Sequence, residues 1–343
     1  MTRTLRIGAR RRSYNPRVTR ARSEFELIDR HFARAPRDAA IRVGIGDDAA
    51  VVTPTPGTEF VLSVDMLVEG RHFFRGTDPR RLGHKTLAVN LSDLAAMGAT
   101  PRFALLAGAL PERDDAWLEA FMRGFRALGE RFGVELIGGD TTRGPRNLCV
   151  TIIGEAPAGT AILRSGARIG DDVYVSGTLG DAALAVAALQ GSITLPDVDL
   201  AVVRDRLECP EPRVELGLHL RCVATAALDV SDGLTGDLQH ILDRSGAGAT
   251  IELCALPRSE ALQRSLEGDA HDVAQACLLA GGDDYELCFT ASRERRDDID
   301  AIANDIALPL ARIGVIEQAP GLRVRGPEGD LLPSVPHAFD HFA

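Results

Sequence analysis

The sequence predicts a two-domain protein of the α/β (or α+β) class, on three observations. The chain has 343 residues, more than one average domain holds. Strand-like apolar runs and helix-like patterns are mixed in both halves of the chain. A stretch rich in Ala, Pro and Gly, EAPAGTAILRSGARIGDD, separates the halves near residue 160. We therefore expect domains at 23–160 and 161–343.

The expected elements of the first half are a helix with an apolar stripe, a long and mostly apolar helix, a third helix, and five strands between them. The helices are placed at 24–35, 79–97 and 114–132, and the strands at 49–52, 60–64, 103–110, 134–137 and 148–153. In the second half the helices are placed at 181–189, 234–242 and 293–305, and the strands at 173–175, 228–230, 285–290, 311–316 and 322–325.

Composition and charge narrow the class of protein. Hydrophobic residues make up 45% of the chain and charged residues 26%, which is ordinary for a globular protein. No apolar run approaches the roughly 20 residues of a membrane helix. The net charge of −10 argues against nucleic acid or an anionic membrane as a partner. The six cysteines are scattered singly, as in a cytoplasmic protein.

Residues 1–22 differ from the rest of the chain. They hold eight arginines and no Asp or Glu, and they lack the apolar core of a secretory signal. We expect an arginine-rich, disordered extension outside the fold; a targeting peptide and an RNA-binding arm are the alternatives.

Phosphate chemistry of the P-loop kind is excluded, because the chain has one lysine, Lys85, and no G-x-x-x-x-G-K-[ST] loop. Motifs for zinc proteases and serine hydrolases are also missing. A protein of this composition that handles phosphate must use arginine, backbone amides or metal ions.

Aspartates recur beside glycines or small residues where apolar segments end. Each one alone is typical of a turn, but the set is harder to explain in that way. The aspartates are Asp47 and Asp48 in GIGDD, Asp65 in LSVDM, Asp93 in NLSDLAAMG, Asp140 in IGGDTTRG, Asp229 and Asp232 in LDVSDGL, and Asp283 and Asp284 in GGDDYEL.

Asp93 illustrates why we expect cations. It lies in a helix pattern flanked by apolar residues, and a shielded carboxylate must be paired or metal-bound. Mg²⁺ prefers oxygen ligands and is usually held by one or two carboxylates, water and substrate phosphates. Several carboxylates therefore suggest several Mg²⁺ ions and a polyphosphate substrate. No EF-hand loop supports calcium.

Anion-binding features accompany the aspartates. Arg164 lies at the domain boundary, and the consecutive amides of IGGDTTRG suit a phosphate nest. Each feature is weak by itself.

The strings GIGDDAAVV, LSVDMLVEGRHF, TLAVNLSDLAAMGATP, LIGGDTTRGP, RSGARIGDDVYVSGTLGD, ALDVSDGLTGDLQHI and GGDDYELCFT occur in this order. Together they resemble the thiamine-monophosphate kinases of the aminoimidazole ribonucleotide synthetase-like superfamily, over nearly the whole chain from Phe25 to Phe342. The absence of Cys before Cys149 argues against the selenophosphate synthetases.

The resemblance implies a two-domain fold, an N-terminal mixed sheet with helices that binds metal and ATP and forms a homodimer, and a C-terminal α/β domain. It implies Mg²⁺-dependent transfer of phosphate from ATP to thiamine monophosphate in the cytoplasm. The implied metal-binding residues are Asp48, Ser63, Val64 (through its carbonyl), Asp65, Asp93, Asp140, Asp229 and Asp232.

The resemblance also implies nucleotide contacts and substrate contacts. The nucleotide positions are Gly139, Asp140, Arg164 and Ser231. The substrate-facing positions are His72, Asp283, where relatives have Glu, and Phe339. We expect Asp93, Asp140, Asp229 and Arg164 to act in catalysis. The alternative, a nucleotide or metal sensor without catalysis, is disfavoured because every expected aspartate is present.

Overall fold

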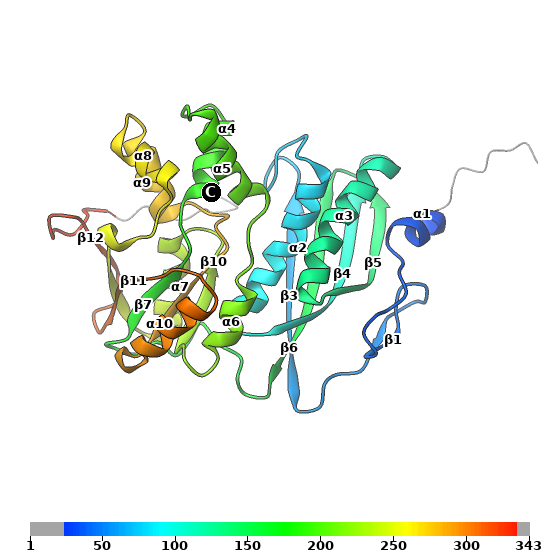
Figure 1. Ribbon diagram of the computed structural model, residues 1–343, viewed down its shortest axis with the longest axis horizontal. Helices are drawn as coiled ribbons and strands as arrows, with labels where there is room; N and C mark the ends of the chain where they lie inside the picture. The colour runs from blue at the N-terminus through cyan, green and yellow to red at the C-terminus, as the bar shows by residue number, and fades with distance from the viewer. Residues whose placement is uncertain (1–23, 335–343) are drawn as a thin grey trace, which may run out of the picture.

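The computed structural model describes residues 24–334 of the chain, with side chains from residue 26. The expected extension at 1–22 lies outside this range. The described elements form two parts, each with its own sheet (Figure 1).

The N-terminal part is built on a four-stranded sheet in the order β3-β6-β4-β5. The β3–β6 and β6–β4 pairs are antiparallel and the β4–β5 pair is parallel, so the predicted mixed sheet is confirmed. Helices α2 and α3 lie together on one face (Figure 1). The elements are α1 (Glu24–His31), β1 (Ile41–Val43), β2 (Val51–Val52), β3 (Thr58–Val68), α2 (Pro79–Ala96), β4 (Thr100–Leu110), α3 (Asp115–Phe132), β5 (Glu135–Arg143) and β6 (Asn147–Pro157).

The C-terminal part contains a six-stranded sheet in the order β12-β9-β11-β7-β10-β8. All pairs are antiparallel except β12–β9. The elements are β7 (Asp172–Ser176), α4 (Asp181–Leu189), α5 (Asp197–Glu208), α6 (Val214–Leu220), β8 (Ala226–Val230), α7 (Leu234–Ser245), β9 (Gly248–Glu252), α8 (Glu260–Glu267), α9 (His271–Ala280), β10 (Glu286–Ala291), α10 (Arg296–Asp305), β11 (Leu310–Glu317) and β12 (Gly321–Arg325).

Both faces of this second sheet are covered, as the burial of successive residues shows. Val173 and Val175 belong to one apolar cluster, whereas Tyr174 between them belongs to another. Because successive side chains of a strand point to opposite faces, β7 contributes to two cores. The cluster that contains Tyr174 continues through α2 into the N-terminal part, so one core joins the two domains.

Helix α2 occupies the junction. It contacts β3 and β6 of one sheet and β8 and β10 of the other, and most of its residues are buried. Asp78 caps its N-terminus by accepting hydrogen bonds from the amides of Arg80 (2.8 Å) and Arg81 (3.0 Å), with Pro79 at the first helical position. A helix buried on all sides can present polar side chains to the space between two domains.

Some boundaries differ from the sequence expectation. Helix α1 ends at His31 rather than at residue 35, and Pro36 disfavours helical geometry just before it. Strand β3 extends to Val68, which places Asp65 inside the strand. Helices α5, α6, α8 and α9 were not predicted.

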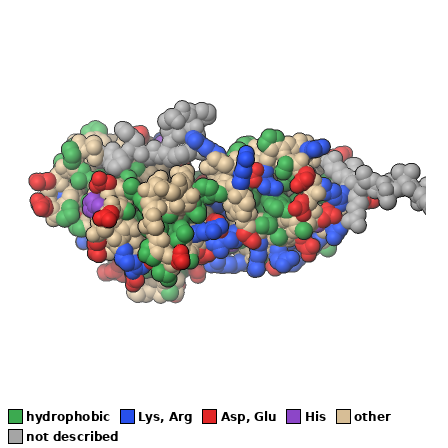
Figure 2. Space-filling view, turned by 90° about the horizontal axis from the view of Figure 1, so that it is seen from above, with side chains coloured by type: hydrophobic (Ala, Val, Ile, Leu, Met, Phe, Trp, Pro, Cys, Tyr) green, Lys and Arg blue, Asp and Glu red, His purple; other side chains and the backbone are tan. Residues whose placement is uncertain are grey.

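The surface carries both signs of charge. Figure 2 shows acidic and basic side chains interspersed over the N-terminal part, on the right of the view. In the described part of the chain, none of the helices combines the length and apolar composition needed to cross a membrane.

Candidate active site

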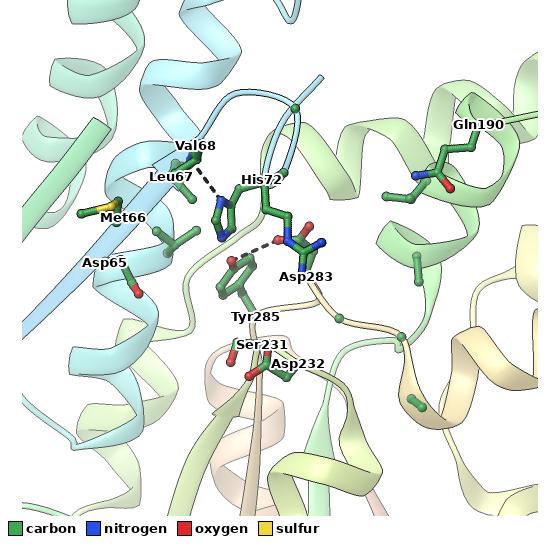
Figure 3. Close-up of a pocket in the computed structure, with 18 residues that line it drawn as sticks. Asp65, Met66, Leu67, Val68, His72, Gln190, Ser231, Asp232, Asp283 and Tyr285 are labelled. Carbon is green, nitrogen blue, oxygen red and sulfur yellow. Dashed lines mark hydrogen bonds between the residues drawn. The ribbon is translucent and has the colours of Figure 1, made fainter. Parts of the chain in front are cut away.

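A cleft of about 800 Å³ opens between the two domains. One wall is the end of β3 and the loop after it, from Asp65 to His72. The other wall is formed by α4, the loop after β8 and the loop before β10 (Figure 3). Segments distant in the sequence therefore meet at a domain interface, where ligand sites preferentially occur.

Strand β3 directs alternate side chains to opposite faces of its sheet. Ser63 and Asp65 are partly buried toward α2, whereas Leu62, Val64 and Met66 are exposed on the outer face. The Ser63 hydroxyl donates a hydrogen bond to the Asp93 carboxylate on α2. Two predicted metal-binding positions are thus in direct contact.

Four carboxylates gather where β3, α2 and β8 approach one another. Burial, with the charges of Asp93 and Asp232, raises the pKa of Asp65 to about 7. Burial raises the pKa of Asp93, which the Ser63 hydrogen bond and Arg164 oppose. Burial and the charge of Asp93 raise the pKa of Asp229 well above its usual range. Carboxylates that raise one another's pKa in a buried place favour cations.

The carboxylates are neighbours, but they do not form a finished cage. Within residues 24–334, no three acidic, imidazole or thiol groups converge on one point as metal ligands would. This arrangement fits Mg²⁺, which is commonly held by one or two carboxylates together with water and substrate phosphates.

The loop after β8 carries Ser231 and Asp232 and is fixed by Asp237 of α7. One oxygen of the Asp237 carboxylate accepts hydrogen bonds from the amides of Ser231, Asp232 and Gly233, each at 3.0 Å. Burial raises the pKa of Asp237 to about 7 although these amides favour its charged form. The loop is therefore rigidly presented to the cleft.

The loop before β10 carries Asp283. Its amide donates to the Ser231 carbonyl (2.8 Å), and the next wall residue, Tyr285, donates its hydroxyl to the Asp283 carboxylate (3.1 Å). The buried Lys85 of α2 forms an ion pair with the same carboxylate at 3.1 Å. Across the cleft, the His72 ring accepts a hydrogen bond from the Val68 amide (3.0 Å). His72 and Asp283 line one cleft, as their predicted shared role requires (Figure 3).

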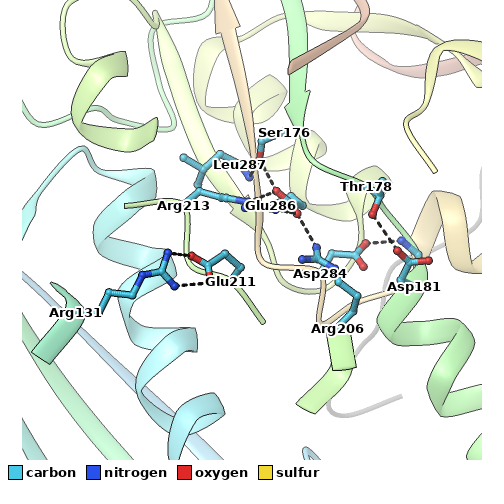
Figure 4. Close-up of polar contacts among 11 residues, drawn as sticks. Arg131, Ser176, Thr178, Asp181, Arg206, Glu211, Arg213, Asp284, Glu286 and Leu287 are labelled. Atoms are coloured by element: carbon cyan, nitrogen blue, oxygen red, sulfur yellow. Dashed lines mark hydrogen bonds and ion pairs between the residues drawn. The ribbon is translucent and has the colours of Figure 1, made fainter. Parts of the chain in front are cut away.

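Glu286 anchors the start of β10 behind this loop. It is fully buried and accepts hydrogen bonds from Arg206, Arg213 and Ser176, each at 2.6 Å (Figure 4). Arg213 follows closely after Glu211, which pairs with Arg131 of α3 in the N-terminal domain. The strand that follows the Asp283 loop is thereby held by an ionic network that reaches the other domain.

Comparison with known proteins gives the family. Residues 46–156 match the model of the AIR synthase related protein N-terminal domain, and residues 168–327 match the model of its C-terminal domain. Thiamine-monophosphate kinase of Salmonella typhimurium is 44% identical over 85% of this chain and 89% of its own length. The chain belongs to the thiamine-monophosphate kinase family.

Solved structures agree with this assignment. Thiamine-monophosphate kinase from Stenotrophomonas maltophilia has a TM-score of 0.82 and 47% identity, covering 90% of this chain and 98% of that one. AaThiL complexed with AMPPCP and TMP has a TM-score of 0.74 and 31% identity, covering 84% and 89%. The predicted two-domain α/β fold is confirmed.

Two of the aspartates assigned to metal in this family member lie apart from the cluster. Asp48 is exposed in the turn between β1 and β2. Asp140 is exposed on β5, three strands from β3 in the sheet order, which is about 14 Å. Asp140 pairs with Ala107 on β4, Ala107 pairs with Cys149 on β6, and Cys149 pairs with Met66 on β3. The Asp140 side chain therefore lies on the same outer face of the sheet as Met66. Their metal-binding role stays a prediction.

The backbone geometry requires a glycine at position 139, apart from the predicted role of Gly139 in nucleotide binding. Its φ is +152°, and a methyl group there would overlap the carbonyl oxygen of Leu106 on β4. The Val64 side chain is exposed on the outer face and carries no oxygen atom, so only the Val64 carbonyl could bind an ion. Phe339 lies outside the described residues, and its substrate-facing role stays a prediction.

Sequence reasoning missed four residues that support the kinase cleft: Lys85, Asp237, Tyr285 and Glu286. Asp237 lies in the first turn of α7, where an acidic residue is favoured, which was a usable signal. The partners of Lys85 and Glu286 are distant in the chain, so no local pattern indicated them.

Proposed function

We propose that this protein transfers the γ-phosphoryl group of ATP to thiamine monophosphate, forming ADP and thiamine diphosphate. Membership of the thiamine-monophosphate kinase family supports this, as does the complex of the relative AaThiL with AMPPCP and TMP. The observation that carries the proposal is the carboxylate cluster, of which Asp65 and Asp232 line the same interdomain cleft as His72 and Asp283.

Several Mg²⁺ ions would be held by Asp65, Asp93, Asp229 and Asp232, with Asp48, Ser63, the Val64 carbonyl and Asp140 as further predicted ligands. When bound, Mg²⁺ neutralises the charge of phosphate oxygens. The pKa shifts of Asp65 and Asp229 favour this assignment, because a nearby cation would relieve the cost of ionising buried carboxylates.

The acceptor needs little activation by the protein. The second pKa of a phosphate monoester is about 6, so thiamine monophosphate is largely dianionic at neutral pH. One of its oxygens would attack the γ-phosphorus directly and in line, and the bond to the bridging oxygen of ADP would break. No proton transfer to a general base and no phosphoenzyme are required.

The chain therefore contributes orientation and charge. The charge of Arg164 acts on Asp93. The Arg164 guanidinium group would donate two parallel hydrogen bonds to the oxygens of a phosphate group. Gly139, Asp140 and Ser231 are the other proposed nucleotide contacts. Asp93, Asp140, Asp229 and Arg164 would together restrain the reacting phosphates against their mutual repulsion.

The organic part of the acceptor would lie near His72 and Asp283, with Phe339 as a further proposed contact. A smaller compartment of about 80 Å³ adjoins the cleft here and is lined by Phe73, Phe74 and Leu82. A cationic ring suits an acidic and aromatic environment, which favours this end of the cleft for thiamine.

We also propose a cytoplasmic homodimer formed through the N-terminal domains. On the outer face of β3, Phe60, Leu62, Val64 and Met66 are 44%, 60%, 59% and 52% exposed. A row of apolar side chains on a sheet face favours a protein partner. All six cysteines are free, in keeping with a reducing compartment. The net charge of −10 disfavours nucleic acid and membranes.

The test is a coupled assay of ADP release with four acceptors: thiamine monophosphate, thiamine, formylglycinamidine ribonucleotide and selenide. We expect Mg²⁺-dependent ADP release with thiamine monophosphate alone. Release from ATP without an acceptor would indicate an ATPase, and silence with every acceptor would indicate a binding protein.

A further inference from the structure

Lys85 is exceptional in this chain. It is the one lysine among 39 basic residues, and it lies 3% exposed on α2 at the domain junction. Lysine carries a compact point charge, whereas arginine carries a broad planar fork. A chain that uses arginine elsewhere thus keeps an ammonium group at this buried place.

The Lys85 ammonium group joins the two walls of the cleft. It lies 3.1 Å from an Asp283 carboxylate oxygen and donates to the His72 carbonyl at 3.3 Å. These partners are the two described residues to which we assign substrate contact. Lys85 also lines the small compartment beside them.

The Asp283 loop is held in an unusual backbone conformation. Asp283 and Tyr285 have φ values of +68° and +52°, which non-glycine residues seldom adopt. Such residues persist where their surroundings over-determine them, and they are common at ligand sites. The Asp283 amide and the Tyr285 hydroxyl fix the loop from its own domain. Lys85 fixes the carboxylate relative to the other domain.

We propose that Lys85 is a positioning residue that holds the Asp283 carboxylate toward the cleft and so determines the affinity for thiamine monophosphate. This inference rests on the proposed function. Lys85 acts through Asp283, not on the reacting phosphates. Removing the ammonium group frees the carboxylate to rotate away, and the substrate then binds less tightly.

A merely structural ion pair makes a different prediction. Buried pairs often add little net stability, although removal of one partner is costly because the other stays buried and charged. In that case Lys85→Met would lower the melting temperature and affect both substrates alike. Removing Asp283 as well would then restore the protein.

The experiment uses the full chain and four variants: Lys85→Met, Asp283→Asn, the double variant, and Arg296→Met as a control. Arg296 forms an ion pair with the buried Asp172 at 2.6 Å, and neither residue lines the cleft. Calorimetry measures the Kd of thiamine monophosphate in the presence of a non-hydrolysable ATP analogue and Mg²⁺. Thermal melting and KM for ATP are measured in parallel. Turnover of the unchanged protein tests the proposed function separately.

We expect each single variant to raise the Kd of thiamine monophosphate roughly tenfold, and the double variant to raise it by about the same tenfold rather than a hundredfold. KM for ATP should stay within about twofold, and Arg296→Met should lower the melting temperature without changing the Kd. An unchanged Kd in Lys85→Met would overturn the inference, as would multiplied effects in the double variant. If the wild-type protein showed no turnover while the Kd values followed the expected pattern, only the proposed function would be overturned.

Discussion

The Ser63 hydroxyl on β3 donates a hydrogen bond to the Asp93 carboxylate on α2. This contact joins the edge strand of the N-terminal sheet to the helix that contacts both sheets. It also stabilises the charged form of a carboxylate whose pKa burial raises. Asp93 is thereby held ready for a cation at the centre of the proposed site.

Replacing Asp93 by Asn should leave the fold intact and lower kcat by a factor of about 100 or more, because the isosteric amide removes a charge that would hold Mg²⁺. Steady-state kinetics at saturating Mg²⁺, with circular dichroism for folding, measure this. Asp298→Asn, on the surface of α10, is the control. Near-normal turnover would remove Asp93 from the proposed cluster.

Mg²⁺ binding should weaken as pH falls, because a protonated carboxylate is a poor ligand. The pKa of Asp65 is raised to about 7 without metal, so the apparent Kd for Mg²⁺ should be roughly tenfold higher at pH 6 than at pH 8. Calorimetric titration of the full chain with Mg²⁺ measures this, and a Kd independent of pH would contradict it.

The same shift affects stability in the absence of metal. A folded-state pKa of about 7 lies above the unfolded value of about 3.9, so this contribution to stability is present below pH 4 and is lost as pH rises through 7. Added Mg²⁺ should therefore raise the melting temperature more at pH 8 than at pH 6. An equal increase at both values would count against Asp65 as a ligand.

Local patterns in the sequence predicted the surroundings of one proposed site residue. Asp93 could be identified because its helix pattern is otherwise apolar, and the structure indeed places it in a buried junction. The contact between Lys85 and Asp283 could not be identified, because it depends on how two domains pack. Residue spacing also does not reveal on which face of a sheet a side chain lies. It therefore gave no sign that Asp140 lies apart from the carboxylate cluster within one chain.

The fold shows the same limit. The strongly amphipathic pattern of α3 was predicted at nearly its full length because Trp117, Phe121 and Phe125 recur at helical spacing. Helix α5 was missed, because its charged residues are interleaved with Val198 and Val202, which remain largely exposed. Its helical state depends on packing against α4 rather than on an apolar stripe of its own.

The outer face of β3 offers a direct test of the dimer. Leu62→Glu should convert a particle of twice the 36.7 kDa chain into a monomer, because a charge would replace an apolar contact at a 60% exposed position. Size-exclusion chromatography with light scattering measures the mass. Val198→Glu on α5, at a 69% exposed position, should leave the mass unchanged. A monomeric mass for the wild-type protein would refute the proposed dimer.

Gly139→Ala should reduce the free energy of unfolding by about 3 kcal/mol, because the added methyl group overlaps the Leu106 carbonyl. Gly133→Ala should cost only about 1 kcal/mol, since Gly133 has φ +69° but open space around it. Urea unfolding of both variants measures the difference. Equal costs would show that backbone conformation, rather than the close strand contact, requires Gly139.

The most direct test of the proposed reaction is phosphorus NMR of the protein with ATP, Mg²⁺ and thiamine monophosphate. The direct-transfer account predicts that ADP and thiamine diphosphate appear together in equal amounts, while thiamine monophosphate declines by the same amount. Formation of ADP and inorganic phosphate with thiamine monophosphate unchanged would contradict it.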